Sequence, residues 1–283
     1  MDGEFKKIII RKPDLDTCLT ALVMGVDDDS SVKIAPNGAE DAELRNREIL
    51  CIESGGSGMI QWNNLDHHHP QIYYPCACVQ AQEVTRKISP KLHHLIKYVS
   101  MIDEGRPINP PVPFPSLSSV FSGMILLTPD RKTAFTKGIR LLKLVLSKSL
   151  DPFQPMPSFE EWQSYIKAKK RNRLYLEKDL AGVLCLRGKK GTSIAYLKSR
   201  SVGGSAELYR QGFNVVVMHN PVLVDYPGIK YTIASQIVQV TGLLGRLNSL
   251  EQGWGGRSNI IGSPAGGSTL APEKILGLVV EYF

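Results

Sequence analysis

Short apolar segments alternate with helix-like segments through the first half of the chain, and this alternation limits the fold more than any other feature. Apolar runs rich in β-branched residues at 5–10, 32–35 and 48–53 predict buried strands. Helices are expected between and after these strands, at residues 18–26, 39–47, 75–88, 91–103 and 131–150. Strands that alternate with helices form parallel sheets. We therefore expect an α/β protein whose N-terminal domain has a mainly parallel sheet with helices on both faces.

A proline-rich segment interrupts this pattern at residues 151–157, where three prolines predict a linker. A helix is expected from residue 158 to about residue 178. Further strands are expected at residues 182–187, 192–198 and 214–218, followed by a long apolar helix that begins at Ser235. We expect one domain over residues 1–150, a linker and connecting helix over 151–180, and a smaller α/β domain over 181–283.

The composition is that of a globular protein and excludes a wholly disordered or fibrous chain, with 42% hydrophobic and 22% charged residues. No apolar run is long enough to cross a membrane, and the acidic start does not resemble a secretory signal, so we expect a cytoplasmic protein.

The net charge of +7 weakly favours anionic partners. The basic segment at residues 167–173 is either a solvated helix face or a contact for phosphate or nucleic acid. The spacing of Cys76 and Cys78 does not match a zinc knuckle, and packed thiols explain them better.

Acidic residues follow the first predicted strand. Asp14 and Asp16 stand just before a predicted helix, so they are either helix caps or ligands of a hard divalent cation. In open α/β sheets, ligands bind outside the carboxyl ends of the strands, which is where these two residues lie.

The segment from Asp66 to His69 places three histidines beside a carboxylate, the ligand mix expected for manganese or a similar ion. The alternative is a solvated surface loop. Glu53 ends a predicted strand, and Asp103 ends a predicted helix, where an acidic residue is unfavourable unless a metal or Arg106 is its partner.

Taken together, these residues resemble the motifs of the Asp-His-His (DHH) phosphoesterase superfamily. The N-terminal motifs are residues 13–17, residues 52–55, the run from Asp66 to His68, and Asp103. Residues 230–235 and 255–258 are similar to the associated C-terminal DHHA1 domain. The resemblance covers nearly the whole chain.

The resemblance implies a catalytic domain that carries two divalent ions, usually manganese, and a smaller domain that closes over a cleft and binds substrate. Asp14 would bind one ion and Asp16 the other, with Glu53 bridging both. His67 and Asp103 would complete the coordination of the second ion. His68, beside Asp66, would face the scissile phosphate. Two ions of this kind activate water and neutralise charge in the transition state.

The second domain is expected to supply phosphate-binding groups. The amides of Gly255 and Gly256 can approach an anion closely, and Arg257 can bind phosphate through two nitrogens. Ser258 completes this motif, for which the alternative is a plain glycine turn. Ser235 is predicted to open a helix, where its hydroxyl is either a cap or a phosphate contact.

The chain departs from the family pattern in three places. Arg11 and Lys12 stand where a metal-binding histidine is usual, and such cations repel a metal ion. The second motif has Glu53 in place of aspartate, and the C-terminal motif has Arg257 in place of histidine.

Two hypotheses follow from these departures. One is an active hydrolase with one retained ion, or with Arg11 or Lys12 supplying the charge of a metal. The other is a degenerate member that binds a phosphate-rich ligand without hydrolysis. A protein that binds nucleic acid through the segment at 167–173 is a third hypothesis. The expected partners are a phosphate-containing small molecule or a short single-stranded nucleic acid, with no membrane, and the family pattern allows a homodimer.

Overall fold

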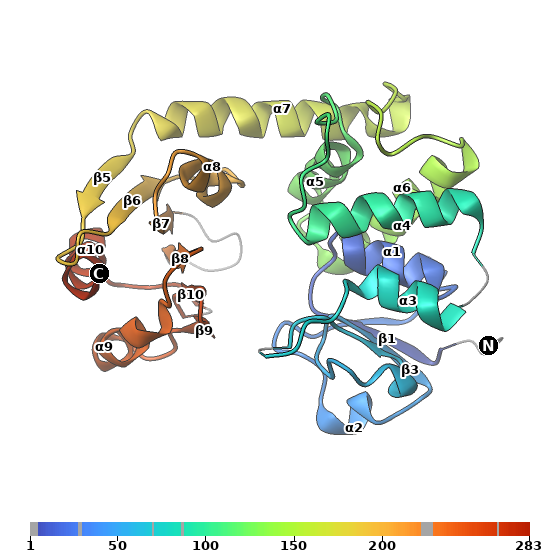
Figure 1. Cartoon of the computed structure of the whole chain (residues 1–283), viewed down its shortest axis with the longest axis horizontal. Helices are drawn as coiled ribbons and strands as arrows, with labels where there is room; N and C mark the ends of the chain where they lie inside the picture. Colours follow the sequence, from blue (N-terminus) through green and yellow to red (C-terminus); the bar gives the residue numbers. More distant parts are fainter. Residues whose placement is uncertain (1–4, 28–29, 70, 86–87, 222–228, 265) are drawn as a thin grey trace. The chain divides into compact units, whose positions relative to one another are not determined.

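The first sheet has buried strands at its centre and a partly buried strand, β2 (Val32–Ile34), at one edge. The computed structural model describes residues 5–27, 30–69, 71–85, 88–221, 229–264 and 266–283. The four strands of the first sheet are all parallel and lie in the order β2-β1-β3-β4. Figure 1 labels the two central strands, β1 and β3. The four strands are β1 (Lys7–Ile10), β2 (Val32–Ile34), β3 (Ile49–Ile52) and β4 (Asn64–Leu65).

Side chains alternate across this sheet, so each central strand serves two cores. Ile8 and Ile10 belong to the larger core, which the helices around α1 cover. Ile9 and Cys51 face the opposite side, where Leu44 of the short helix α2 packs on them. The helices of this unit are α1 (Leu15–Val23), α2 (Asp41–Leu44), α3 (Ala77–Thr85), α4 (Pro90–Asp103), α5 (Leu117–Leu127) and α6 (Arg131–Ser147), with a 3₁₀ turn η1 (Ile60–Trp62).

The chain divides into two compact units, Met1–Lys169 and Lys170–Phe283, so the division falls inside the long helix α7 (Glu160–Leu180). The proline-rich segment before α7 packs against the first unit: Met156 is buried, and its amide donates to the Pro115 carbonyl at 2.7 Å. The domain ranges expected from the sequence stay predictions.

The second unit has a six-stranded mixed sheet in the order β5-β6-β7-β8-β10-β9. Only β6 and β7 pair in parallel among the described strands of this sheet; the other neighbours are antiparallel. Its elements are β5 (Leu184–Arg187), β6 (Ser193–Lys198), α8 (Gly204–Arg210), β7 (Val215–Asn220), β8 (Lys230–Ser235), η2 (Thr241–Leu243), α9 (Leu244–Leu250), β9 (Gly255–Arg257), β10 (Ile260–Gly262) and α10 (Pro272–Tyr282).

The expected fold class is confirmed: a parallel sheet flanked by helices is followed by a second α/β unit. The prediction of a long helix that begins at Ser235 is wrong, because Ser235 is the last residue of β8 and pairs with Val215 of β7. The α-helix begins only at Leu244, after a 3₁₀ turn. Glycine and β-branched residues between Ser235 and Leu244 disfavour helix, and pairing of β8 with two neighbouring strands decides the structure there. No helix among the described residues is long and apolar enough to cross a membrane.

Candidate metal centre

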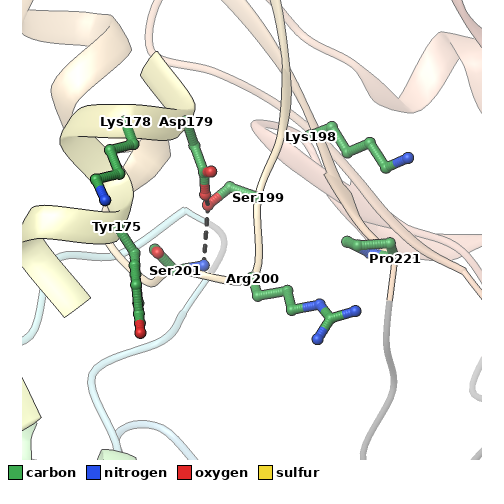
Figure 2. A pocket seen from close by; sticks show the side chains of 8 residues that line it. All are labelled: Tyr175, Lys178, Asp179, Lys198, Ser199, Arg200, Ser201 and Pro221. Carbon is green, nitrogen blue, oxygen red and sulfur yellow. Dashed lines mark hydrogen bonds between the residues drawn. The ribbon is translucent and has the colours of Figure 1, made fainter. Parts of the chain in front are cut away.

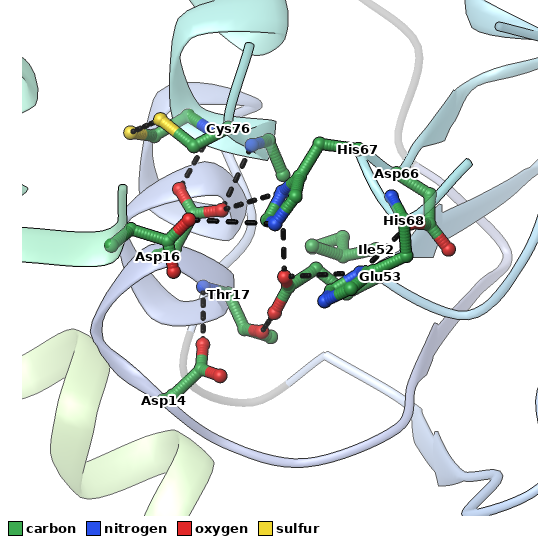
Figure 3. Close-up of polar contacts among 12 residues, drawn as sticks. Asp14, Asp16, Thr17, Ile52, Glu53, Asp66, His67, His68 and Cys76 are labelled. Atoms are coloured by element: carbon green, nitrogen blue, oxygen red, sulfur yellow. Dashed lines mark hydrogen bonds and ion pairs between the residues drawn. The ribbon is translucent and has the colours of Figure 1, made fainter. Parts of the chain in front are cut away.

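The ends of three parallel strands bring the predicted ligands to one edge of the first sheet. Asp14 and Asp16 follow β1, Glu53 follows β3, and residues 66–68 follow β4. Figure 3 shows the side chains of Asp16, Glu53 and His67 pointing toward one another. The carboxyl ends of parallel strands are where ligands bind in such sheets, and the sequence argument for this edge therefore agrees with the structure.

Asp16 is buried and is held by the first turn of α3. Its two carboxylate oxygens accept from the amides of Ala77 and Cys78, at 2.8 and 2.9 Å. Burial raises the pKa of Asp16 to about 7, although these hydrogen bonds oppose the shift. The carboxylate is therefore fixed in place, and a bound cation would offset the unfavourable free energy of burying its negative charge.

Glu53 is buried and has a left-handed backbone, with φ of 49°. Such a conformation is unfavourable for a residue with a side chain and is concentrated at functional sites. The Thr17 hydroxyl donates to Glu53 Oε2 at 2.7 Å and fixes the carboxyl group. Burial, with the charges of Asp14 and Asp16, raises the pKa of Glu53 to about 9.

His67 lies at the centre of the acidic groups. Its Nε2 is 3.5 Å from Asp103 Oδ2, and its Nδ1 is 3.6 Å from Glu53 Oε1 and 3.9 Å from Asp16 Oδ2. The Nδ1 atom is buried and has no hydrogen-bond partner among the described residues. A buried ring nitrogen without a partner requires an explanation, and a cation between these groups would provide one.

The donor set fits a divalent ion. One group of ligand atoms comes from Asp16, His67 and Asp103, and a second comes from Glu53, His67 and His68; within each group the atoms lie within 4.8 Å of one another. Carboxylate oxygens with imidazole nitrogens suit manganese or magnesium better than a soft metal.

Asp66 orients His68. Its Oδ1 accepts from the His68 amide at 2.7 Å and lies 3.0 Å from His68 Nδ1, while Oδ2 accepts from the Gly55 amide at 2.7 Å. Burial alone would raise the pKa of Asp66, but these contacts hold it well below its usual range. The ring of His68 stacks on that of His67, with centroids 4.1 Å apart.

Asp14 lies outside both groups of ligand atoms. It caps α1, because its Oδ1 accepts from the Thr17 amide at 3.0 Å, and its Oδ2 pairs with Lys12 Nζ at 2.8 Å. Burial opposes the charged forms of the Asp14 carboxylate and the Lys12 ammonium. The attraction between these two side chains outweighs burial, so it lowers the pKa of Asp14 and raises the pKa of Lys12. An ammonium group thus occupies the side of Asp14 where the family pattern implies a first metal ion.

Other candidates belong to neither group of ligand atoms. Arg11 Nη2 lies 3.5 Å from the position that a Cβ on Gly38 would occupy. Arg106 binds Glu104 Oε2 at 2.7 Å and does not provide the partner suggested for Asp103. His69 Nδ1 accepts from the amides of two residues that follow it, at 3.1 and 2.9 Å, and so stabilises a turn.

Cys76 and Cys78 also come close to Asp16, with their sulfur atoms 3.5 Å apart. Burial raises the pKa of the Cys78 thiol, which disfavours the thiolate that binds metals. This arrangement agrees with packed thiols.

In the second unit, the predicted phosphate-binding motif forms an exposed hairpin. Gly255, Gly256 and Arg257 make up the edge strand β9, and Ser258 is in the turn that follows. A Cβ on Gly256 would lie 2.2 Å from the Ile260 carbonyl oxygen, so the close approach of β10 itself requires glycine there. Binding of phosphate by this hairpin stays a prediction.

The expectation that Ser235 caps a helix is wrong. Its side chain is buried at the end of β8, donates to the Asn214 carbonyl at 2.7 Å, and accepts from the amides of Ile237 and Val238. The first of these bonds ties the end of β8 to the residue before β7, and the other two close the turn that follows β8. A phosphate contact by Ser235 stays a prediction.

Sequence reasoning missed three groups that position the site: the Thr17 hydroxyl, the first amides of α3, and the Gly55 amide. The place of Thr17 before a helix suggests only a role in the cap, and nothing in its spacing indicates a bond to Glu53. The amides carry no signal in the sequence, since any residue supplies one.

Comparison with known proteins gives the fold. No family model matches the chain, and no curated protein matches its sequence. Among solved structures, a pGpG-specific phosphodiesterase, PggH from Vibrio cholerae, matches with a TM-score of 0.59 and 11% identity over 97% of both chains. The DHH domain of a member of a family of ribosomal proteins matches with a TM-score of 0.52 and 10% identity, over 90% of this chain and 82% of that one. The chain therefore has the fold of DHH proteins, as the resemblance implied.

Proposed function

We propose that this chain, which has the DHH fold, is a metal-dependent phosphoesterase that hydrolyses a phosphate-rich substrate. One observation carries the proposal. The buried Nδ1 atom of His67 has no hydrogen-bond partner among the described residues and faces carboxylates at the carboxyl edge of a parallel sheet. Titratable groups with shifted pKa values in such a position are typical of active sites.

In this proposal one divalent ion, manganese or magnesium, would be held by His67, with Asp16 and Asp103 from one group of ligand atoms and Glu53 from the other. When bound, such an ion supplies positive charge to phosphoryl oxygens and activates water. Asp16 and Glu53 are well suited to this role because the α3 amides and the Thr17 hydroxyl already fix their carboxyl groups. Ligands fixed in advance lose little freedom on binding.

His68 is the candidate for proton transfer. With its Nδ1–H donated to Asp66, the Nε2 atom is left as an acceptor that can take a proton or, once protonated, give one to a leaving oxygen. Asp66 would hold the ring in this tautomer, as a buried carboxylate does in other acid–base pairs.

Lys12 is the candidate for the charge that a second ion would otherwise supply. Its ammonium group pairs with Asp14 and interacts electrostatically with Glu53 and Asp103, two of the proposed ligands. Positive side chains stabilise a phosphoryl group during transfer, so loss of one metal site need not abolish hydrolysis.

The solved structure with the higher TM-score given above is that of a phosphodiesterase specific for pGpG. We therefore propose a short oligonucleotide as the substrate class and a linear dinucleotide as the first substrate to try.

The test is release of mononucleotide or phosphate from pGpG, a short RNA, polyphosphate and pyrophosphate, with manganese or with chelator. We expect turnover of at least one substrate with manganese and none with chelator. Replacing His68 by alanine should lower kcat by about 100-fold or more. The matched control is His69→Ala, which removes the neighbouring imidazole from outside the cluster and should leave turnover unchanged.

Equal turnover by wild type and His68→Ala would contradict the proposed role of His68. If folded wild-type protein bound manganese but hydrolysed none of the panel, the degenerate, ligand-binding hypothesis would replace the proposal.

A further inference from the structure

A cavity of about 560 Å³ opens in the second unit, within residues that belong to that unit alone (Figure 2). Its lining comes from the last turns of α7, from the segment after β6 and from Pro221, which follows β7. A cavity of this size is within the range of small-molecule sites.

The position of the cavity in the topology is that of a ligand site. β6 and β7 pair in parallel and are joined through α8. The lining residues 199–201 and 221 come directly after the carboxyl ends of these two strands. Ligands of α/β sheets bind at such strand ends.

The lining is strongly basic. Lys178, Lys198 and Arg200 are exposed, and the side chain of none of the three has a hydrogen bond or ion pair with the part of the chain that the structure describes. Among the described lining residues the single carboxylate is that of Asp179, which accepts from the Ser199 hydroxyl at 2.6 Å. Three cations that line one cavity without ion pairs to the described residues favour an anionic ligand, and Figure 2 shows Lys198 and Arg200 on one side of it and Lys178 on the other.

The segment that carries two of these cations is held in place before any ligand binds. Ser199 Oγ bonds Asp179 and accepts from the Ser201 amide at 2.9 Å. The buried side chain of Asn172 on α7 bonds both the amide and the carbonyl of Val202, each at 3.0 Å. A fixed loop binds a ligand with less loss of conformational freedom than a free one.

An aromatic ring completes the site. Tyr175 lines the cavity from α7, and 54% of its surface is exposed. An exposed ring beside cations is the combination with which proteins bind nucleotides, because the base stacks on the ring while the cations hold phosphate.

We propose that this cavity binds a nucleotide, with Lys178, Lys198 and Arg200 holding its phosphate and Tyr175 stacking on its base. The site is separate from the exposed hairpin at residues 255–258 that the family pattern suggests. It needs no metal ion and does not rest on the hydrolysis proposed above.

The test is calorimetric binding of GMP, guanosine and inorganic phosphate to the full chain in the presence of chelator. GMP should bind at least tenfold more tightly than guanosine, and the affinity for GMP should fall as the salt concentration increases. Lys198→Ala and Arg200→Ala should each weaken GMP binding about tenfold, since each removes a charge-assisted contact. Tyr175→Ala should weaken it while Tyr175→Phe retains it. The control is Lys274→Ala, which removes an exposed lysine on α10 and should leave binding unchanged.

Both charged side chains are exposed, so these variants should fold as the wild type does. Absence of GMP binding, equal affinity for guanosine, or no effect of the Lys198 and Arg200 substitutions would overturn the proposal. GMP binding that His67→Ala abolishes and Lys198→Ala leaves intact would place the nucleotide in the first unit and would also overturn it. Because binding is measured without metal, its failure is distinguishable from a failure of hydrolysis.

Discussion

Replacing Asp66 by asparagine tests how the site is held together. The buried carboxylate accepts two amide hydrogen bonds at 2.7 Å, from Gly55 and His68, and so ties together the segments that follow β3 and β4. Hydrogen bonds to a charged group contribute about 1.5–3 kcal/mol each, and a buried donor left without an acceptor costs about 1–3 kcal/mol. Asparagine keeps one oxygen but turns an NH₂ group toward the other amide. We expect the free energy of unfolding to fall by about 2–4 kcal/mol.

The assay is urea unfolding of the metal-free protein at pH 7. The matched control is Asp103→Asn, because Asp103 carries a charge in the same cluster but has a raised pKa and only His67, at 3.5 Å, as a described partner. Burial disfavours the Asp103 carboxylate in the folded state, so its neutralisation should leave metal-free stability unchanged or raise it. If Asp66→Asn were as stable as the wild type, the structural role given to Asp66 would be wrong.

Further predictions concern charge and packing elsewhere. Glu43, between Lys7 and Lys33, has a pKa lowered to about 2 because these contacts outweigh its burial; Glu43→Gln should cost about 1 kcal/mol in unfolding experiments at pH 7. The pKa of Glu43 is lower in the folded than in the unfolded protein, so the difference in unfolding free energy between wild type and Glu43→Gln should shrink as the pH falls from about 4.5 toward 2 and should be absent below pH 2. A difference that stays constant with pH would contradict this prediction. Lys12→Gln removes the ammonium group that pairs with Asp14 and repels a metal ion there, so calorimetry should detect a second, weaker manganese ion that the wild type does not bind; a single ion bound by both proteins would count against this role. A Cβ on Gly123 would lie 2.0 Å from the Tyr165 carbonyl oxygen, so Gly123→Ala should lower the melting temperature, whereas Gly245→Ala in α9, where a Cβ meets nothing within 4 Å, should raise it; equal shifts would refute the packing argument.

Much of the first unit follows from local sequence patterns. The three predicted strands of its sheet are confirmed as β1, β2 and β3, because a short β-branched run between helix signals has few other stable arrangements. Parallel pairing then fixes which strand ends meet, and so brings Asp16 and Glu53 together. The strand β4, which precedes His67, was not predicted, and only the family resemblance grouped His67 with these carboxylates.

The second unit was harder to predict, because its strands depend on pairing between distant segments. β8 is central between β7 and β10, yet its sequence runs into a segment that resembles an apolar helix. The pocket at Lys198 and Arg200 had no motif to reveal it, since it arises only where the ends of β6 and β7 meet α7. The ion pair of Lys12 with Asp14 likewise could not be predicted from the sequence, because the sequence places both Arg11 and Lys12 near the expected first metal ion and does not show which of them contacts Asp14.

The central claim is that His67 and its carboxylate neighbours form a site for one divalent ion. Calorimetric titration of chelator-treated protein with manganese tests it most directly, with His67→Ala beside the wild type and His69→Ala as the control. We predict one ion bound by the wild type and by His69→Ala, and loss of this binding in folded His67→Ala protein. A wild type that binds no manganese, or a His67→Ala variant that binds it equally well, would contradict the claim.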